Sequence, residues 1–463
     1  MESLEPDQKE LNKFLTHSIK TAKWGLKVAR IMAAALSAID PYAAVIDGLR
    51  YSEYPPTELP ERDYLAKYHR IKLIGAGKAG QPMAEAAQEF FGDRISEGMV
   101  IVKDGYTKKS SLSKRIKIVE AGHPLPDQRG VNATQEIIKH LQNSTANDLV
   151  ICLISGGGSA LLVSPVEGVL LDELQHLTEL LLASGATINE INTLRKHLDR
   201  VKGGQLAQIA SPARVLCLIL SDVVGDPLDV IASGPTVPDS STYQDALDIL
   251  VRYAILEQVP TSIRTHLELG QQGNIPETPK PGDHFFSNVH NMIVGSNHTA
   301  TQAAISQAKI EGFNTLTLTN YMQGEASQVG KFLGSVLRQL ALQNQPIPRP
   351  ACVIVGGETT VTIKGNGMGG RNQELALGAV AELDGLKDIA LITLTTDGGD
   401  GPSDAAGAVV TGDTLSRAKS MGLEPEEYLA NNDSYNYFSP LEDLLRIGPT
   451  RTNVNDLTFL FAF

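Results

Sequence analysis

The chain is poor in cysteine, has a single tryptophan and contains no long hydrophobic run. Its 3 cysteines, Cys152, Cys217 and Cys352, each lie inside an apolar, strand-like segment of the 463 residues. An odd number of cysteines in such places predicts reduced structural thiols in a cytoplasmic protein. Because no run of about 18 apolar residues occurs, we expect no membrane-spanning helix.

Basic residues are also in the minority. The chain carries 40 Lys and Arg against 53 Asp and Glu, a balance that disfavours general nucleic-acid or membrane-surface binding. The overall charge balance is still compatible with a local basic pocket for an anionic small substrate. It is also compatible with a homo-oligomer. The first residues, MESLEPDQKE, are polar and acidic, so they predict neither a signal peptide nor a transit peptide.

Three common catalytic signatures are absent. The sequence holds no G-x-x-x-x-G-K-[ST] segment, no Cys/His cluster with zinc spacing, and no G-x-S-x-G around Ser155 or Ser159. These absences exclude a P-loop nucleotide site and disfavour a structural zinc site or a nucleophile elbow.

Apolar strand patterns instead alternate with helical patterns along most of the chain. They occur at residues 71–74, 99–103, 116–120, 149–154, 215–220, 291–294, 314–318, 351–355, 359–364, 389–395 and 457–463. Continuous apolar strands that alternate with helices predict an α/β fold with mostly parallel sheets covered on both faces. The length suggests two or three domains, and a Gly- and Pro-rich segment marks a passage between domains within residues 239–283. We therefore expect an N-terminal domain at 1–240 and a C-terminal domain at 241–463.

Glycine loops follow several of these strands. The segment GAGKAG at 75–80 has the dinucleotide fingerprint spacing, with Asp104 as a candidate ribose-binding acid. Lys78 near a helix start opposes the helix dipole, which favours a bound anion there. The segment SGGGS at 155–159 allows close backbone approach to a phosphate. Each loop taken alone is also typical of a tight strand–helix turn.

The second half has a comparable loop. The segment from Gly356 to Glu374 contains six glycines and one arginine, Arg371, directly before a helical pattern. Backbone N–H groups in such loops bind anions, and an arginine forks onto phosphate or carboxylate oxygens.

Charged residues at other strand ends complete the candidate set. Arg195 and Lys202 share one face of a helical pattern that runs into Gly203-Gly204, and a solvated helix face explains them equally well. Asp222, Asp397 and Asp400 follow buried strands, where open α/β sheets place ligands and where Mg²⁺ takes one or two carboxylates. Aspartates in glycine turns also serve local hydrogen bonding.

Taken together and in order, these segments closely resemble one family. The segments are GAGKAG, SGGGSALL, NTLRKHLDRVKGGQLA, SDVVGDPLDVIASGPTVPD, GGETTV, GNGMGGRNQE and TDGGDGPSDAAGA. They resemble the class II D-glycerate 2-kinases, the MOFRL-type glycerate kinase family, over nearly the whole chain. Some members of that family carry a hydroxypyruvate reductase name.

The resemblance implies two α/β domains with the active site in the cleft between them. The first would hold a Rossmann-like parallel sheet, and the second, smaller one a mixed sheet with the MOFRL region at about 350–460. It also implies ATP- and Mg²⁺-dependent phosphorylation of D-glycerate at the 2-hydroxyl, which gives 2-phosphoglycerate and ADP. The catalytic lysine and arginine of the family correspond to Lys78 and Arg371, and we add Asp222 as a candidate base.

The remaining candidates divide into two groups. The metal ligands are Asp397 and Asp400. The substrate- or nucleotide-binding residues are Gly77, Ser155, Gly156, Gly157, Gly158, Ser159, Arg195, Lys202, Gly357, Glu358, Gly369 and Gly370. Two other functions stay open at this point: an NAD(P)H-dependent hydroxypyruvate reductase, which GAGKAG and Asp104 would support, and a nucleotide sensor without turnover.

Overall fold

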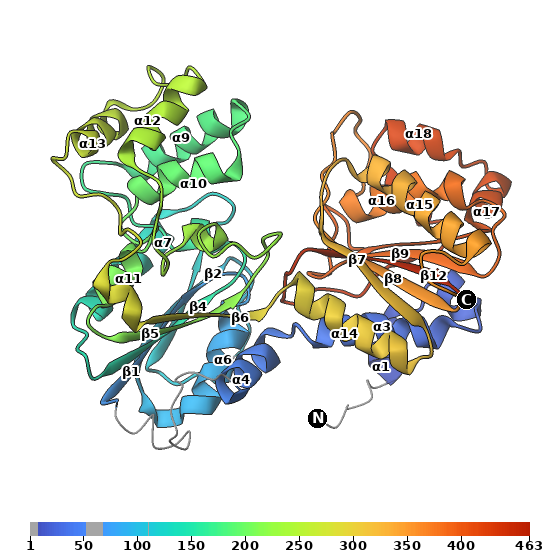
Figure 1. The fold of residues 1–463 in the computed structure, drawn as a ribbon, viewed down its shortest axis with the longest axis horizontal. Helices are drawn as coiled ribbons and strands as arrows, with labels where there is room; N and C mark the ends of the chain where they lie inside the picture. The colour runs from blue at the N-terminus through green and yellow to red at the C-terminus, as the bar shows by residue number, and fades with distance from the viewer. Residues whose placement is uncertain (1–7, 52–67, 110) are drawn as a thin grey trace. The chain divides into compact units, whose positions relative to one another are not determined.

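The computed structural model describes residues 8–51, 68–109 and 111–463, which fold into two compact units (Figure 1). The middle unit spans Pro41–Val294, and the terminal unit combines the segment up to Asp40 with Gly295–Phe463.

The middle unit is built on a six-stranded sheet with the order β3-β2-β1-β4-β5-β6. Its strands are β1 (Arg70–Ala76), β2 (Ile95–Lys103), β3 (Ile116–Ala121), β4 (Asp148–Ile154), β5 (Arg214–Leu220) and β6 (Val289–Gly295). Strand β1 runs parallel to β2 and β4, β2 runs parallel to β3, and β4 runs parallel to β5. The predicted Rossmann-like sheet is confirmed. The strand order reverses between β1 and β4, and this switch point is where such sheets bind ligands.

Helices flank the sheet of the middle unit. They are α4 (Pro41–Tyr51), α6 (Gly80–Phe91), α7 (Gln128–Gln142), α8 (Gly158–Leu161), α9 (Leu171–Ala183), α10 (Ile188–His197), α11 (Gln205–Ala210), α12 (Tyr243–Arg252) and α13 (Thr261–Gln271). Helices α9, α10, α12 and α13 share an apolar core of their own, and Figure 1 shows them as one group, which we call the helical cluster.

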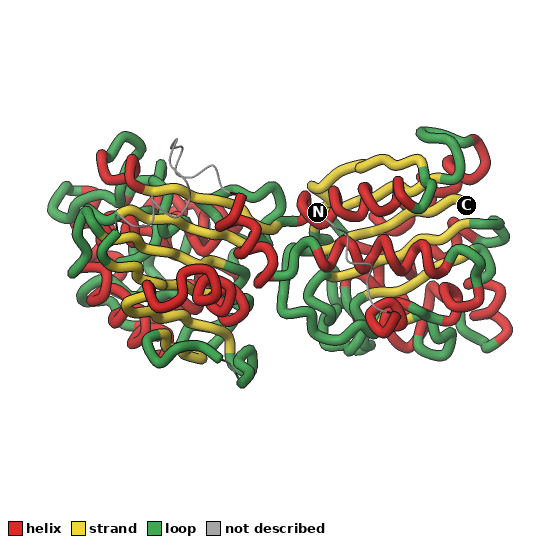
Figure 2. The backbone as a smooth tube through the Cα atoms, turned by 90° about the horizontal axis from the view of Figure 1, so that it is seen from below, coloured by secondary structure: helices red, strands yellow, loops and turns green. Residues whose placement is uncertain are grey.

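The terminal unit has a mixed six-stranded sheet with the order β11-β10-β9-β12-β8-β7, as the resemblance implied. Its strands are β7 (Asn314–Met322), β8 (Ala351–Gly357), β9 (Ile389–Thr395), β10 (Gly407–Thr411), β11 (Leu444–Leu445) and β12 (Asp456–Ala462). Strand β12 is buried between β8 and β9 and antiparallel to both, so the expected C-terminal strand is confirmed. Figure 2 shows the strands as two separate sets.

Helices cover both faces of the mixed sheet. They are α1 (Gln8–Leu11), α2 (His17–Thr21), α3 (Gly25–Ser37), α14 (Asn297–Ile310), α15 (Ala326–Gln343), α16 (Arg371–Leu383), α17 (Thr414–Ser420), α18 (Pro425–Ala430) and α19 (Ser434–Phe438). Figure 1 shows α15 and α16 on one face and α3 and α14 on the other.

The boundary between the units differs from the one expected at residues 240 and 241. The segment that follows residue 240 forms α12 and α13, which pack on α9 and α10 and so stay in the middle unit. The N-terminal helices belong to the terminal unit, because α3 packs on α14 and Arg30 forms an ion pair with Glu311 at 2.5 Å. The chain therefore crosses between units at 40/41 and at 294/295.

Two of the expected strands also differ from the structure. The segment 359–364 is a loop that is exposed in part, with the isolated bridge of Glu325 with Thr360. The strand expected at 291–294 is β6, and it joins the sheet of the middle unit.

No single helix of the described residues is long and apolar enough to cross a membrane. Only Gly25–Ser37 and Pro41–Arg50 taken together pass that test, with a bend of 61° between them.

Candidate active site

Two glycine loops contact each other at the switch point of the middle unit. The backbone N–H of Lys78, after β1, donates to the carbonyl of Gly156, after β4, at 2.8 Å. The N–H of Ala79 donates to Ser155 Oγ at 3.0 Å. A Cβ on Gly77, whose φ is +141°, would come within 2.1 Å of Ser155 Oγ, so only glycine fits there. The two loops thus form one backbone surface.

A carboxylate packs on this surface at Gly156. The position of a Cβ on Gly156 lies 2.2 Å from Asp222 Oδ2, so the Asp222 side chain, which follows β5, is in contact with the loop backbone. Burial raises the pKa of Asp222, and the charge of Lys78 offsets part of that rise. Lys78 and Asp222, both predicted from the sequence, are brought together.

A histidine packs on the same surface at Gly157. A Cβ on Gly157 would lie 2.8 Å from His123 Cδ2 and 3.0 Å from Nε2. Burial, followed by the charges of Lys78 and Lys103, lowers the pKa of His123 to about 4, so the imidazole is neutral at pH 7. In the sequence, the segment GHPLPD at 122–127 is typical of a turn, and its histidine is a possible ligand contact. Its place directly after β3, at the carboxyl edge of the sheet, is the signal that identifies it.

Hydrogen bonds tie the second glycine loop to the helical cluster. Ser159 Oγ lies 3.0 Å from Ser233 Oγ, which donates to Asn192 Oδ1 on α10 at 3.0 Å. Ala232 and Ser233 have φ values of +50° and +60°, a conformation that non-glycine residues adopt mainly where the surroundings impose it. The site region is therefore held in a strained backbone.

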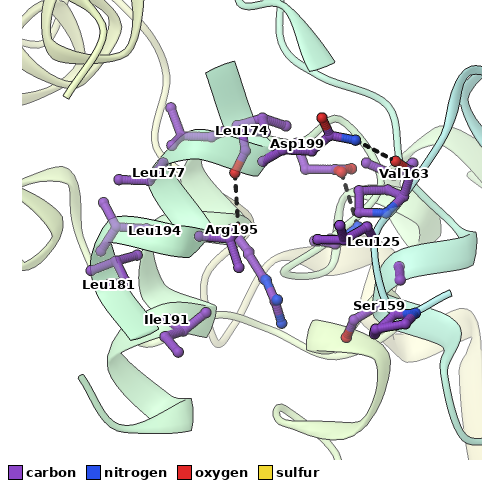
Figure 3. Close-up of a pocket in the computed structure, with 17 residues that line it drawn as sticks. Leu125, Ser159, Val163, Leu174, Leu177, Leu181, Ile191, Leu194, Arg195 and Asp199 are labelled. Carbon is purple, nitrogen blue, oxygen red and sulfur yellow. Dashed lines mark hydrogen bonds and ion pairs between the residues drawn. The ribbon is translucent and has the colours of Figure 1, made fainter. Parts of the chain in front are cut away.

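Arg195, on α10, and Lys202, in the turn that follows it, have different surroundings. Lys202 is buried and donates to Asp199 Oδ2 at 2.9 Å and to the Leu162 carbonyl at 2.6 Å. Burial lowers its pKa and Asp199 opposes that shift, so Lys202 has a structural partner. Arg195 is half-buried, and burial lowers its pKa. The described residues give its guanidinium no hydrogen-bond partner, and the side chain extends into a cavity on the side of Ser159 (Figure 3).

Arg371 begins helix α16 in the terminal unit and is paired there. Its Nε and Nη2 donate to the two Asp456 oxygens at 2.5 and 3.0 Å, and Nη1 lies 3.0 Å from Glu358 Oε1. Burial alone lowers the pKa of Arg371, but Asp456, Glu358 and Asp400 raise it above the usual value. Three of the five guanidinium N–H groups are engaged, so two remain for a ligand anion.

Asp456 owes its place to the sheet register. It lies opposite Gly357 on one side and Thr395 on the other, so β12 brings it to the end of both β8 and β9. No motif in the sequence marks Asp456, because its partners come from strands distant in the chain.

Asp400 caps helix α16. Its carboxylate accepts the N–H groups of Asn372 at 3.2 Å and Gln373 at 2.8 Å, and a Cβ on Gly370 would come within 2.3 Å of its Cγ. Burial raises the pKa of Asp400 to about 6, against the lowering effect of the Gln373 N–H. The neighbouring Gly369 packs on Ser434, where a Cβ would lie 2.2 Å from Oγ. Gly369 and Gly370 thus allow close packing around the start of this helix.

The donor set fits Mg²⁺ at only one of the two expected aspartates. Asp397 accepts from Thr395 Oγ1 at 3.1 Å and from the Gly399 N–H at 3.2 Å, both through Oδ1, which leaves Oδ2 for a metal. Both Asp400 oxygens instead accept backbone N–H groups. Within the described residues, no group of three or more His, Cys, Asp or Glu could hold a metal ion. Mg²⁺ in proteins takes one or two carboxylates together with phosphate and water ligands.

Replacing Asp400 tests its role as a helix cap. Asp400→Ala should lower the free energy of unfolding by about 1–3 kcal/mol, because two buried N–H groups lose their acceptor. Asp400→Asn should cost less, since the amide oxygen still accepts. Asp404→Ala, at an exposed carboxylate of the same loop, should change stability by less than about 1 kcal/mol. Denaturant unfolding, with a chelator and again with added Mg²⁺, measures all three. If Asp400→Ala loses only a Mg²⁺-dependent stabilisation, Asp400 is a metal ligand after all.

The pKa of His123 can be measured by NMR titration. The imidazole should stay neutral at pH 6, and Lys78→Met should raise its pKa because one repelling charge is removed. Lys139→Met, in the last turn of α7, is the control and should leave it unchanged. The folded pKa lies below the usual 6.5, so His123 contributes stability above pH 6.5 that is lost as the pH falls towards 4. A pKa near 6.5 in the wild-type protein would contradict this burial.

Comparison with known proteins identifies the family of the chain. The model of the domain of unknown function DUF4147 matches residues 27–268, and the MOFRL family model matches residues 351–456. A D-glycerate 2-kinase of Thermotoga maritima is 45% identical over 388 residues, which are 84% of this chain and 89% of that protein. A glycerate 2-kinase of Pyrococcus horikoshii is 41% identical over 429 residues, 92% of this chain and 95% of that protein.

A solved structure has the same fold. The crystal structure of a glycerate kinase (EC 2.7.1.31) from Thermotoga maritima superposes with a TM-score of 0.85 at 42% identity and covers 94% of this chain and 99% of that one. Some relatives, such as one from Agrobacterium vitis, carry a hydroxypyruvate reductase name instead. The chain belongs to the DUF4147–MOFRL family of glycerate kinases, which are phosphotransferases with an alcohol group as acceptor.

Proposed function

We propose that the protein is a glycerate 2-kinase that transfers the γ-phosphoryl group of ATP to the 2-hydroxyl of D-glycerate. The observation that carries the proposal is the joint surface of the two glycine loops, on which Lys78, Asp222 and His123 converge at the switch point. Relatives above 40% identity that are named glycerate 2-kinase support the same reaction. ATP and D-glycerate are then the small-molecule partners, and Mg²⁺ the metal.

The residues suit phosphoryl transfer, which depends on positioning and on neutralising charge. Lys78 would neutralise charge on the transferring group, and the loop N–H groups would hold phosphate oxygens. Asp222 would accept the proton of the 2-hydroxyl, since its raised pKa brings it nearer to the working pH of a general base. The neutral His123 would position the substrate by hydrogen bonding at Nε2. A nucleotide-bound Mg²⁺ supplies further charge neutralisation, and Asp397 would hold it.

Arg371 has a double role in this proposal. Its two remaining N–H groups would hold the glycerate carboxylate or the phosphoryl group, while its pair with Asp456 orders the loop. Gly357, Glu358, Gly369 and Gly370 would then shape the loop around Arg371.

The reductase alternative is weaker at the residue it needs. Both Asp104 oxygens accept from Arg129, each at 2.7 Å, so the candidate ribose acid already has a partner.

We further propose a cytoplasmic location, on the ground that all three cysteines are free and buried.

A coupled assay tests the reaction. ADP formation should require both D-glycerate and a divalent metal, and the product should be consumed by enolase without a mutase, because the phosphate is on the 2-oxygen. L-Glycerate serves as the control acceptor. Oxidation of NADH or NADPH by hydroxypyruvate, with no ADP formed from D-glycerate, would identify a reductase, and nucleotide binding without either activity would identify a sensor.

Paired variants test whether Lys78 and Arg371 act on one group. Lys78→Met and Arg371→Lys should each lower turnover by a factor on the order of 10³. Lys78→Met removes a positive charge, and Arg371→Lys keeps the charge but loses the planar guanidinium fork. Arg371→Lys is preferred to Arg371→Ala, since removing the charge leaves Asp456 buried and unpaired, at a cost of about 3–5 kcal/mol.

The double variant Lys78→Met/Arg371→Lys should be little slower than either single one, because residues that act as a unit are not additive. Arg129→Lys serves as a matched control with normal turnover. Fully multiplicative effects of the two changes would mean that the two cations serve separate steps.

A further inference from the structure

The middle unit contains a cavity between α9, α10 and the loop that follows β3 (Figure 3). The enclosed part of the cavity measures about 50 Å³, and the space counted out into its open mouth measures about 590 Å³. Its walls are largely aliphatic: Leu174, Leu177, Leu181, Ile191 and Leu194.

The polar groups of the cavity are few and unequal in availability. Asp199 and Lys202 also line it, but they form an ion pair at 2.9 Å, so their charges cancel. Arg195 is the remaining cation of the lining, and the described residues offer it no hydrogen bond. Figure 3 shows its guanidinium between Ile191 and Ser159.

The cavity adjoins the second glycine loop in the chain. Ser159 and Ala160 line its wall, and they directly follow Gly156–Gly158. A nucleotide with its phosphates on that loop would therefore have the cavity beside it.

We propose that this cavity binds the base of the nucleotide, with Arg195 at its mouth on the phosphate side. The inference rests on the proposed function and deepens it. D-Glycerate has three carbons that carry a carboxylate and two hydroxyls, so it gains nothing from five aliphatic walls. The base is the only flat, weakly polar surface in either substrate, and its burial against these side chains is favourable. An arginine can meet it with a planar face or a fork on phosphate.

Filling the cavity tests the proposal. Thr178 lies on α9, lines the cavity and is half-buried, so Thr178→Phe adds volume there without removing a core side chain. Its control is His176→Phe on the same helix, at a position that points outward, with 51% of its side chain exposed. Calorimetry measures binding of ATP and of inorganic tripolyphosphate, which has no base, and circular dichroism checks that each variant is folded.

Thr178→Phe should weaken ATP binding by about tenfold or more, with tripolyphosphate binding and the KM for D-glycerate unchanged. His176→Phe should bind ATP as the wild type does. Leu174→Ala, which enlarges the cavity, should also weaken ATP but not tripolyphosphate, and it supplies a second variant if the first does not fold.

Unaltered ATP affinity in both folded cavity variants would overturn the proposal. So would a loss of D-glycerate affinity with normal ATP binding, since the cavity would then hold the other substrate. A third outcome separates the two proposals. If the variants change ATP binding as expected but the wild-type protein phosphorylates no glycerate, the proposed function is wrong and the base site is still supported.

Discussion

The contact between the loops after β1 and β4 is the constraint on which the candidate site depends. Two backbone N–H groups, those of Lys78 and Ala79, are satisfied by the neighbouring loop at Gly156 and Ser155. Buried N–H groups without an acceptor are costly, so this pairing fixes both loops at once. Glycine at 77 is required because a Cβ would collide with Ser155.

That surface in turn sets the electrostatics of the groups on it. Asp222 and His123 are both half-buried and packed against glycine backbone, and the charge of Lys78 acts on both. Burial raises the pKa of Asp222 and lowers the pKa of His123, because it disfavours the charged form of each side chain. A neutral imidazole and one lysine beside the two glycine loops suit an anionic ligand.

The terminal unit reaches a comparable arrangement by a different route. Arg371 is held by Asp456 and Glu358, and Asp400 closes the start of α16. These pairs order a loop that contains several glycines and would otherwise be costly to fix. An arginine with two N–H groups left over is thereby preorganised, which matters more for catalysis than the strength of any one pair.

The sequence by itself determined the α/β class, most strands and the identity of the glycine loops, because continuous apolar strands and strand–glycine–helix junctions are local patterns. It also marked Lys78, Asp222 and Arg371, since charged residues at strand ends stand out in an otherwise apolar pattern. The tertiary structure alone decided the rest. Asp456 became the partner of Arg371 only when β12 inserted between β8 and β9. The assignment of α12 and α13 to the middle unit, and of α3 to the terminal unit, followed from shared apolar faces. Lys202 and Asp400 became structural rather than open, because burial obliges a charge to take a partner, and which partner is near is a property of the fold.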